Sequence, residues 1–117
     1  MTRPVGPYTP IVRAGDWLVC SGQIALRDGD LIDGDPAAQA AQALANLREL
    51  LEGAGGSMSD VTKTTVFLTD MADYAAVNEV YVEAFGDHRP ARSAIAVSGL
   101  PLGALVEVEA WAFSPAE

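Results

Sequence analysis

The sequence predicts an α+β fold in which a mostly antiparallel sheet carries two helices on a single face. Residues 61–68, 90–97 and 105–113 are rich in β-branched, small and aromatic residues that alternate with polar ones, as in strands. Residues 36–51 and 74–85 instead repeat apolar side chains at intervals of three and four, the period of an amphipathic helix. Because neither helix is apolar all round, both are expected to cover one face of the sheet.

Length, charge and cysteine content restrict the class of protein. At 117 residues the chain is expected to form one domain, residues 1–117, that folds without disulfide bonds or metals. Sixteen acidic against seven basic side chains give a net charge of −9, which disfavours nucleic acid and anionic membranes as partners. The single Cys20 and the lack of a long apolar run predict a cytosolic protein with no membrane span.

The first half of the chain is expected to form a hairpin and then a helix. Residues 11–14 and 17–22 flank the turn Gly15-Asp16, whereas residues 23–34 suggest a strand end, a turn and a loop. Asp35 suits the N-cap of the helix that follows, and Gly53 suits the left-handed position at its end. The apolar stripe of this helix is Ala40, Leu44, Leu47 and Leu51, and the side chains expected to face elsewhere are Gln39, Gln42, Asn46 and Glu49.

The second half is expected to supply a central strand, a second helix and two final strands. Residues 61–68 are dominated by β-branched side chains. Asp70 is a candidate cap for a helix that runs to about Phe85 and stops at Gly86, with Asn78 beside its apolar stripe. The stripe consists of Tyr74, Val77, Tyr81 and Phe85. The predicted order is therefore roughly β-β-α-β-α-β-β.

The last two strands carry the ionic residues of greatest interest. Period-2 geometry places Arg92 on one face with Ala94 and Ala96, so that only small side chains surround it. In the final strand the carboxylates share a face with large apolar residues, which are Leu105, Trp111 and Phe113. Such an apolar face predicts a homo-oligomer built with this sheet face inward, and a ligand pocket there would be the natural place for Arg92.

The residues alone leave two interpretations of each of these charges open. Arg92 could form an ion pair with Glu107 or Glu109 on a neighbouring strand, which geometry alone favours, or could bind a planar anion through its guanidinium fork. Either glutamate could be a solvated strand residue or a partly buried general base. His88 and Cys20 offer neither a triad nor a metal site, so any catalysis would use water, a carboxylate and an arginine.

Several segments together resemble the Rid family, also named YjgF/YER057c/UK114. The resemblance extends from Gly6 to Ala112 and implies a chorismate-mutase-like fold, a homotrimer, and ligand sites between subunits. The segments that carry it are Gly6-Pro7-Tyr8, Ser21-Gly22-Gln23-Ile24, residues 61–68, residues 74–81, Arg89-Pro90-Ala91-Arg92-Ser93 and Val106-Glu107-Val108-Glu109-Ala110.

The resemblance implies an activity and assigns roles to residues. RidA-like deaminases hydrolyse reactive 2-imino acids, such as 2-iminobutanoate and 2-iminopropanoate, or their enamine tautomers, to 2-oxo acids and ammonia. These imines are released by pyridoxal-phosphate enzymes, and the hydrolysis itself requires no cofactor or metal. By this resemblance Arg92 grips the substrate carboxylate and Glu107 positions the attacking water. The residues expected to line the cleft are Tyr8, Ser21, Asn78 and Ala94, the last through its backbone.

One departure and two alternative functions accompany this assignment. Many members carry cysteine where this chain has Ala94, which should remove a reactive thiol without removing the chemistry. A non-catalytic trimer that binds small carboxylate metabolites in the same cleft is the main alternative. Ribonuclease activity, attached to some family names, is disfavoured by the charge of −9 and the lack of a basic groove.

Overall fold

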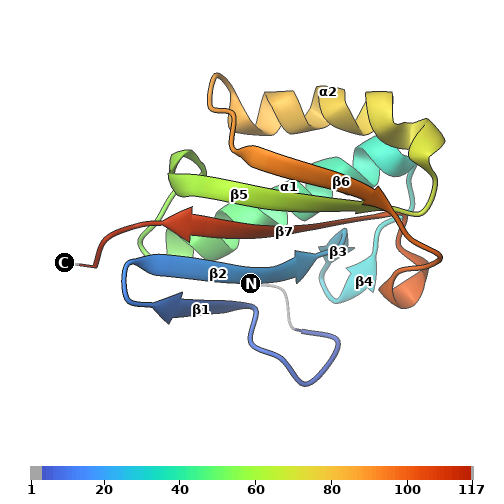
Figure 1. The fold of residues 1–117 in the computed structure, drawn as a ribbon. Coiled ribbons are helices and arrows are strands. Elements are labelled where there is room, and N and C mark those ends of the chain that lie inside the picture. The colour runs from blue at the N-terminus through green and yellow to red at the C-terminus, as the bar shows by residue number, and fades with distance from the viewer. Residues whose placement is uncertain (1–3, 117) are drawn as a thin grey trace.

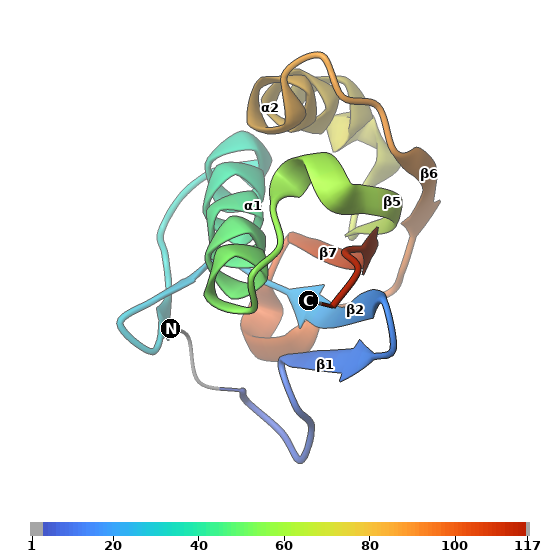
Figure 2. The same ribbon diagram turned by 90° about the vertical axis from the view of Figure 1, so that its left-hand side faces the viewer.

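The computed structural model describes residues 4–116, and its main feature is a five-stranded sheet with both helices on one face (Figures 1 and 2). In spatial order the strands are β1 (Ile11–Ala14), β2 (Trp17–Gln23), β7 (Val106–Phe113), β5 (Val61–Leu68) and β6 (Ala91–Ala96). Neighbouring strands are antiparallel except β5 and β6, which are parallel and are connected through helix α2 (Tyr74–Phe85). The predicted α+β class and the single helical layer are confirmed.

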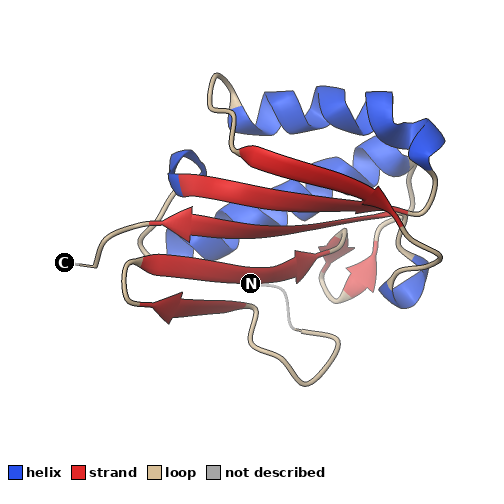
Figure 3. Cartoon of the chain, in the orientation of Figure 1, coloured by secondary structure: helices blue, strands red, loops and turns tan. Residues whose placement is uncertain are grey.

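A second, two-stranded sheet was not predicted. Strands β3 (Leu26–Arg27) and β4 (Asp30–Leu31) pair with each other beside the main sheet (Figure 3), which makes the order β-β-β-β-α-β-α-β-β. Their turn places Asp28 and Gly29 at φ of 55° and 87°, a conformation that aspartate tolerates and glycine favours. Strands of two residues are too short to show a period of two, so the sequence pattern indicated only a turn and a loop.

Helix α1 (Pro36–Gly53) begins as predicted and ends later than predicted. The Asp35 side chain accepts a hydrogen bond of 2.8 Å from the backbone N–H of Ala38, which makes it the N-cap. Gly53 remains helical, and the first glycine after the helix with a positive φ is Gly55, at 89°. Both glycines fit a helix terminus, so the sequence could not distinguish them. The predicted stripe Ala40, Leu44, Leu47 and Leu51 is buried against the sheet.

Two amides of α1 that were expected to point away from the core are buried. Gln39 accepts a hydrogen bond of 2.8 Å from the backbone N–H of Leu105. The Asn46 amide donates to the carbonyls of Ile24 and Leu26, at 3.1 and 2.9 Å. Both side chains therefore satisfy backbone groups of neighbouring segments. A pattern of polar and apolar residues does not reveal such pairings, because it counts every amide as exposed.

The second helix is preceded by a short 3-10 turn. Asp70 accepts a hydrogen bond of 2.9 Å from the N–H of Ala72 and so caps residues Met71–Asp73, whereas α2 itself starts at Tyr74. Helix α2 ends at Phe85, and the C-cap residue Gly86 has a φ of 64°. Further 3-10 turns span Met58–Asp60 and Pro101–Gly103. Among residues 4–116, no helix is long and apolar enough to cross a membrane.

Candidate active site

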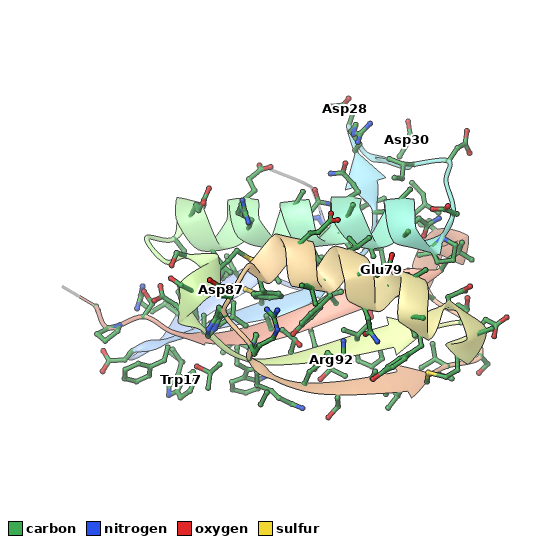
Figure 4. All side chains as sticks on the ribbon, turned by 90° about the horizontal axis from the view of Figure 1, so that it is seen from above. Trp17, Asp28, Asp30, Glu79, Asp87 and Arg92 are labelled. Atoms are coloured by element: carbon green, nitrogen blue, oxygen red, sulfur yellow. The ribbon has the colours of Figure 1, made fainter. Side chains whose placement is uncertain are left out.

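Arg92 lies on the helix-covered side of the edge strand β6. It is paired in register with Thr64 of β5, a buried residue whose side chain is directed toward α2. Figure 4 shows Arg92 beside α2, where this helix passes over the strands. Its Nη1 donates to Oδ1 of Asn78 at 2.6 Å and its Nη2 donates to the hydroxyl of Tyr74 at 2.8 Å. The α2 helix therefore fixes the guanidinium with two neutral acceptors.

The structure corrects two expectations about Arg92. The open face of the sheet was expected to hold it, and an ion pair with Glu107 or Glu109 was the interpretation that geometry favoured. Instead, the glutamates are in register with Phe67 and Thr65 of β5, which alternate with the helix-facing Thr64. Among the described residues, Arg92 forms no ion pair. No carboxylate among residues 4–116 thus compensates the guanidinium charge.

Ala94 follows Arg92 on the same side of β6 and presents a backbone donor at the edge of the sheet. The N–H of Val97 bonds to the carbonyl of Leu68 in β5, at 2.8 Å. Since successive N–H groups of a strand point to alternate sides, the N–H of Ala94 is directed to the outer edge of β6. No described strand pairs with that edge. A ligand bound beside Arg92 could therefore accept a hydrogen bond from this backbone group.

Glu107 belongs to a different group of residues, on the open face of the sheet. Glu107 lines a cleft of about 350 Å³ together with Tyr8 and Ser21, two other residues that the family resemblance assigns to the site. The Ser21 hydroxyl donates to the carbonyl of Thr9 at 2.7 Å and so ties the segment that carries Tyr8 to β2. The full lining consists of Val5, Tyr8, Ser21, Gly22, Ile24, Pro101, Glu107 and Glu109.

Gly22 makes room for the Glu107 carboxyl group. Between Cys20 and Gln23 the register of β2 against β7 shifts, and Gly22 lies within this irregular segment. A Cβ built on Gly22 would lie 2.7 Å from the Glu107 carboxyl carbon, well inside van der Waals contact. Sequence reasoning noted Gly22 only as part of a motif. Its steric role depends on the strand irregularity, which has no sequence signature of its own.

The surroundings of Glu107 favour its protonated form. Burial raises the pKa of its carboxyl group, and the negative charge of Glu109 raises that pKa further. A carboxyl group with a raised pKa is a stronger base than an ordinary glutamate, so it can accept a proton from water and later return it.

Tyr74 contacts Arg92 and is a further residue of the candidate site. Sequence reasoning placed it in the buried stripe of α2, although its side chain is 40% exposed.

The six residues that the resemblance assigns to the site thus form two groups. Arg92, Asn78 and Ala94 lie together at β6 and α2. Tyr8, Ser21 and Glu107 lie together in the cleft on the opposite face of the sheet. Within residues 4–116, no cluster of three or more histidine, cysteine, aspartate or glutamate side chains has the arrangement of a metal site.

Comparisons with known proteins agree with the motifs. A sequence model of the family described as Endoribonuclease L-PSP matches residues 1–114. A RutC family protein of Pyrococcus horikoshii is 46% identical over 95% of this chain and 90% of its own length. The 2-iminobutanoate/2-iminopropanoate deaminase of Mus musculus is 44% identical over 91% of this chain and 80% of its own.

Solved structures extend the similarity to the fold. RidA from the Antarctic bacterium Psychrobacter sp. PAMC 21119 superimposes with a TM-score of 0.92 and 38% identity, over 96% of this chain and 92% of that one. This structure shares the helix and strand arrangement described above, and the family match covers almost the entire sequence. The chain therefore belongs to the Rid family, also known as YjgF/YER057c/UK114.

Proposed function

We propose that the protein hydrolyses 2-imino acids and their enamine tautomers to 2-oxo acids and ammonia, in the manner of a 2-iminobutanoate/2-iminopropanoate deaminase. The observation that carries this proposal is that Arg92 is held in place by neutral groups only. Its guanidinium is oriented by Asn78 and Tyr74, both neutral, and forms no ion pair with a described residue. An oriented and uncompensated guanidinium is suited to bind the carboxylate of a small substrate.

In the proposed mechanism, Arg92 binds the carboxylate and the N–H of Ala94 polarises the imine or the water. Glu107 removes a proton from water as the water oxygen bonds to the imine carbon, and it returns this proton to the nitrogen, which gives a carbinolamine. Glu107 then transfers the proton of the carbinolamine hydroxyl group to the nitrogen. The C=O bond forms as the C–N bond breaks, and ammonia leaves with a 2-oxo acid. Orientation and acid–base catalysis provide the acceleration, the latter typically ~10²–10⁴-fold. The proposed reaction uses no cofactor or metal.

We further propose that the site is completed between two copies of the chain in a homotrimer. Arg92 and Glu107 occupy opposite faces of one sheet, so a small substrate requires one group from each of two chains. The open face also presents Trp17, Trp111 and Phe113 to solvent, with exposures of 36, 48 and 45%. An aromatic patch of this kind on a sheet face favours a subunit interface.

A coupled assay tests the activity. The purified protein is added to a pyridoxal-phosphate dehydratase reaction, and the release of 2-oxo acid is followed for several imines. We expect faster release with wild type, and loss of that effect in Arg92→Ala and in Glu107→Gln. Arg48→Ala removes an exposed arginine from α1 and serves as the control that should retain activity. Arg92→Ala with wild-type activity would overturn the proposal.

Two other functions make different predictions. A binding protein for small carboxylate metabolites would bind 2-oxo acids saturably without shortening the lifetime of the imine. Ribonuclease activity is suggested by the description of the family, but a charge of −9 with only seven Lys and Arg residues disfavours RNA binding. RNA cleavage that co-purifies with the protein and disappears in a site variant would support it.

We also propose that the protein acts in the cytosol. Its single cysteine, Cys20, is buried, and the relatives do not fix the compartment, because one from Schizosaccharomyces pombe is named mitochondrial. Cell fractionation with an antibody against the native protein tests this part of the proposal.

A further inference from the structure

We propose that Tyr74 is a second ligand of the substrate carboxylate, to which its hydroxyl group donates a hydrogen bond beside Arg92. This inference deepens the proposed function and rests on it, since it concerns the same anion site. Nothing in the motifs assigned a role to this side chain. Its contacts, its exposure and the contrast with a neighbouring tyrosine carry the inference.

The Tyr74 hydroxyl group has an unused proton. The oxygen accepts a hydrogen bond of 2.8 Å from Nη2 of Arg92, and this contact leaves the hydroxyl proton unused. Among residues 4–116, no group accepts that proton. The side chain is 40% exposed, so the donor faces solvent beside a cation. An anion that binds Arg92 would meet this donor as well.

Tyr81 lies about two turns further along the same side of α2 and has a different role. Both rings contact the guanidinium, with their centroids 5.3 and 5.0 Å from its central carbon. The Tyr81 hydroxyl, however, is paired with the hydroxyl of Thr64 at 2.7 Å, and Tyr81 is only 5% exposed. Tyr81 therefore serves the core, whereas Tyr74 offers its hydroxyl group to the ligand side of Arg92.

Arg92 retains hydrogen-bond donors for a ligand. A guanidinium has five N–H donors, and the described residues use two of them, one for Asn78 and one for Tyr74. The remaining donors are available to a carboxylate, whose two oxygens accept about four hydrogen bonds. A hydroxyl donor beside the fork adds a contact that favours an ionised carboxylate over a neutral amide, which is a basis for substrate specificity.

The test is Tyr74→Phe, which keeps the ring on the guanidinium and removes only the hydroxyl group. Binding of 2-oxobutanoate is measured by isothermal titration calorimetry, and imine hydrolysis is measured by the coupled assay. A hydrogen bond to a charged group predicts a Kd about 10-fold higher. The KM should rise with it, while kcat changes by less than about 2-fold because the contact is present before and during the reaction. Thermal stability should match wild type.

The same substitution made in the Arg92→Lys variant distinguishes direct binding of the ligand by Tyr74 from an effect of Tyr74 on the position of Arg92. If Tyr74 contacts the ligand, Tyr74→Phe should weaken 2-oxobutanoate binding by a similar factor when Arg92→Lys is already present. If Tyr74 acts only through the guanidinium, the second substitution adds no loss, and this result would overturn the inference. An unchanged Kd for Tyr74→Phe alone would overturn it too.

The same measurements distinguish this inference from the proposed function. A protein that binds 2-oxobutanoate through Tyr74 but does not accelerate imine hydrolysis would retain the inference and refute the deaminase. An active deaminase with the same KM and Kd in Tyr74→Phe would refute the inference alone. Failure of wild type to bind any 2-oxo acid would refute both.

Discussion

Arg92 and Glu107 lie on opposite faces of one sheet, with the strand β5 between their strands. Arg92 is in register with Thr64, whose side chain faces the helices, and Glu107 is in register with Phe67, whose side chain faces away from them. The two charges consequently do not neutralise each other. Each remains available on its own side of the sheet, which explains why a site that uses both would require two chains.

The protonation of Glu107 predicts a pH-dependent effect on stability. Its raised pKa means that the folded state holds the proton more tightly than the unfolded chain, so stability falls as the pH rises through the raised pKa. Glu107→Gln removes the disfavoured charge. We expect this variant to have a higher Tm than wild type at pH 8 and no such advantage at pH 4, measured by calorimetry at one chain concentration.

The control is Glu83→Gln, which changes an exposed glutamate on α2. Its Tm difference from wild type should be small at both pH values. An advantage of Glu107→Gln that is equal at pH 4 and pH 8 would contradict a raised pKa.

Gly22→Ala should impair catalysis with little loss of folding stability. The new Cβ would lie 2.7 Å from the Glu107 carboxyl carbon, and that carboxyl group would have to move. Displacement of a general base predicts a fall in kcat of about 10-fold or more. Gly99→Ala is the matched control, because its Cβ would meet no atom within 4 Å. Equal kcat for Gly22→Ala and wild type would show that the steric contact is not functional.

The sequence predicted the main elements because their periods are long enough to recognise. The stripe of α1, the N-cap Asp35 and the terminal Gly86 all occur where the pattern placed them. The β3–β4 hairpin was not predicted, since strands of two residues show no period. The buried amides of Gln39 and Asn46 were misplaced because their partners are backbone groups distant in sequence.

The candidate site was less predictable than the fold. Alternation within β6 and within β7 was read correctly, but the relation between the two strands depends on their common neighbour β5. Without that register, Arg92 and the glutamates were placed on one face. Similarly, Tyr74 was assigned to the core because it shares the helical spacing of Val77 and Tyr81. Only the three-dimensional structure shows that its hydroxyl group reaches Arg92.

Asn46→Ala should destabilise the fold. The substitution removes the buried donor of the Leu26 carbonyl and one of the two donors of the Ile24 carbonyl, which also accepts from the N–H of Leu26, at a cost of about 1–3 kcal/mol. Urea unfolding at a fixed chain concentration measures this loss. Glu52→Ala, at an exposed position of the same helix, should change stability by less than about 0.5 kcal/mol. Equal unfolding midpoints for the two variants would contradict the structural role of the amide.

Cys20 should be chemically inert in the native protein. Its side chain is 3% exposed, and burial raises the pKa of its thiol to about 12, so the reactive thiolate is scarce at pH 8. Ellman's reagent should therefore modify denatured protein rapidly and native protein only slowly. Rapid modification of the native protein at pH 8 would show that Cys20 is accessible. Because Ala94 is not a cysteine, no other thiol contributes to the signal.

The measurement that tests the central claim most directly is complementation between two inactive variants. Arg92→Ala and Glu107→Gln are unfolded together in equal amounts and refolded, so that mixed oligomers form. If each site takes Arg92 from one chain and Glu107 from another, random assembly restores both groups at about one site in four, and deaminase activity returns to about a quarter of wild type. If the mixture is as inactive as either variant alone, the two residues do not act together across a subunit interface.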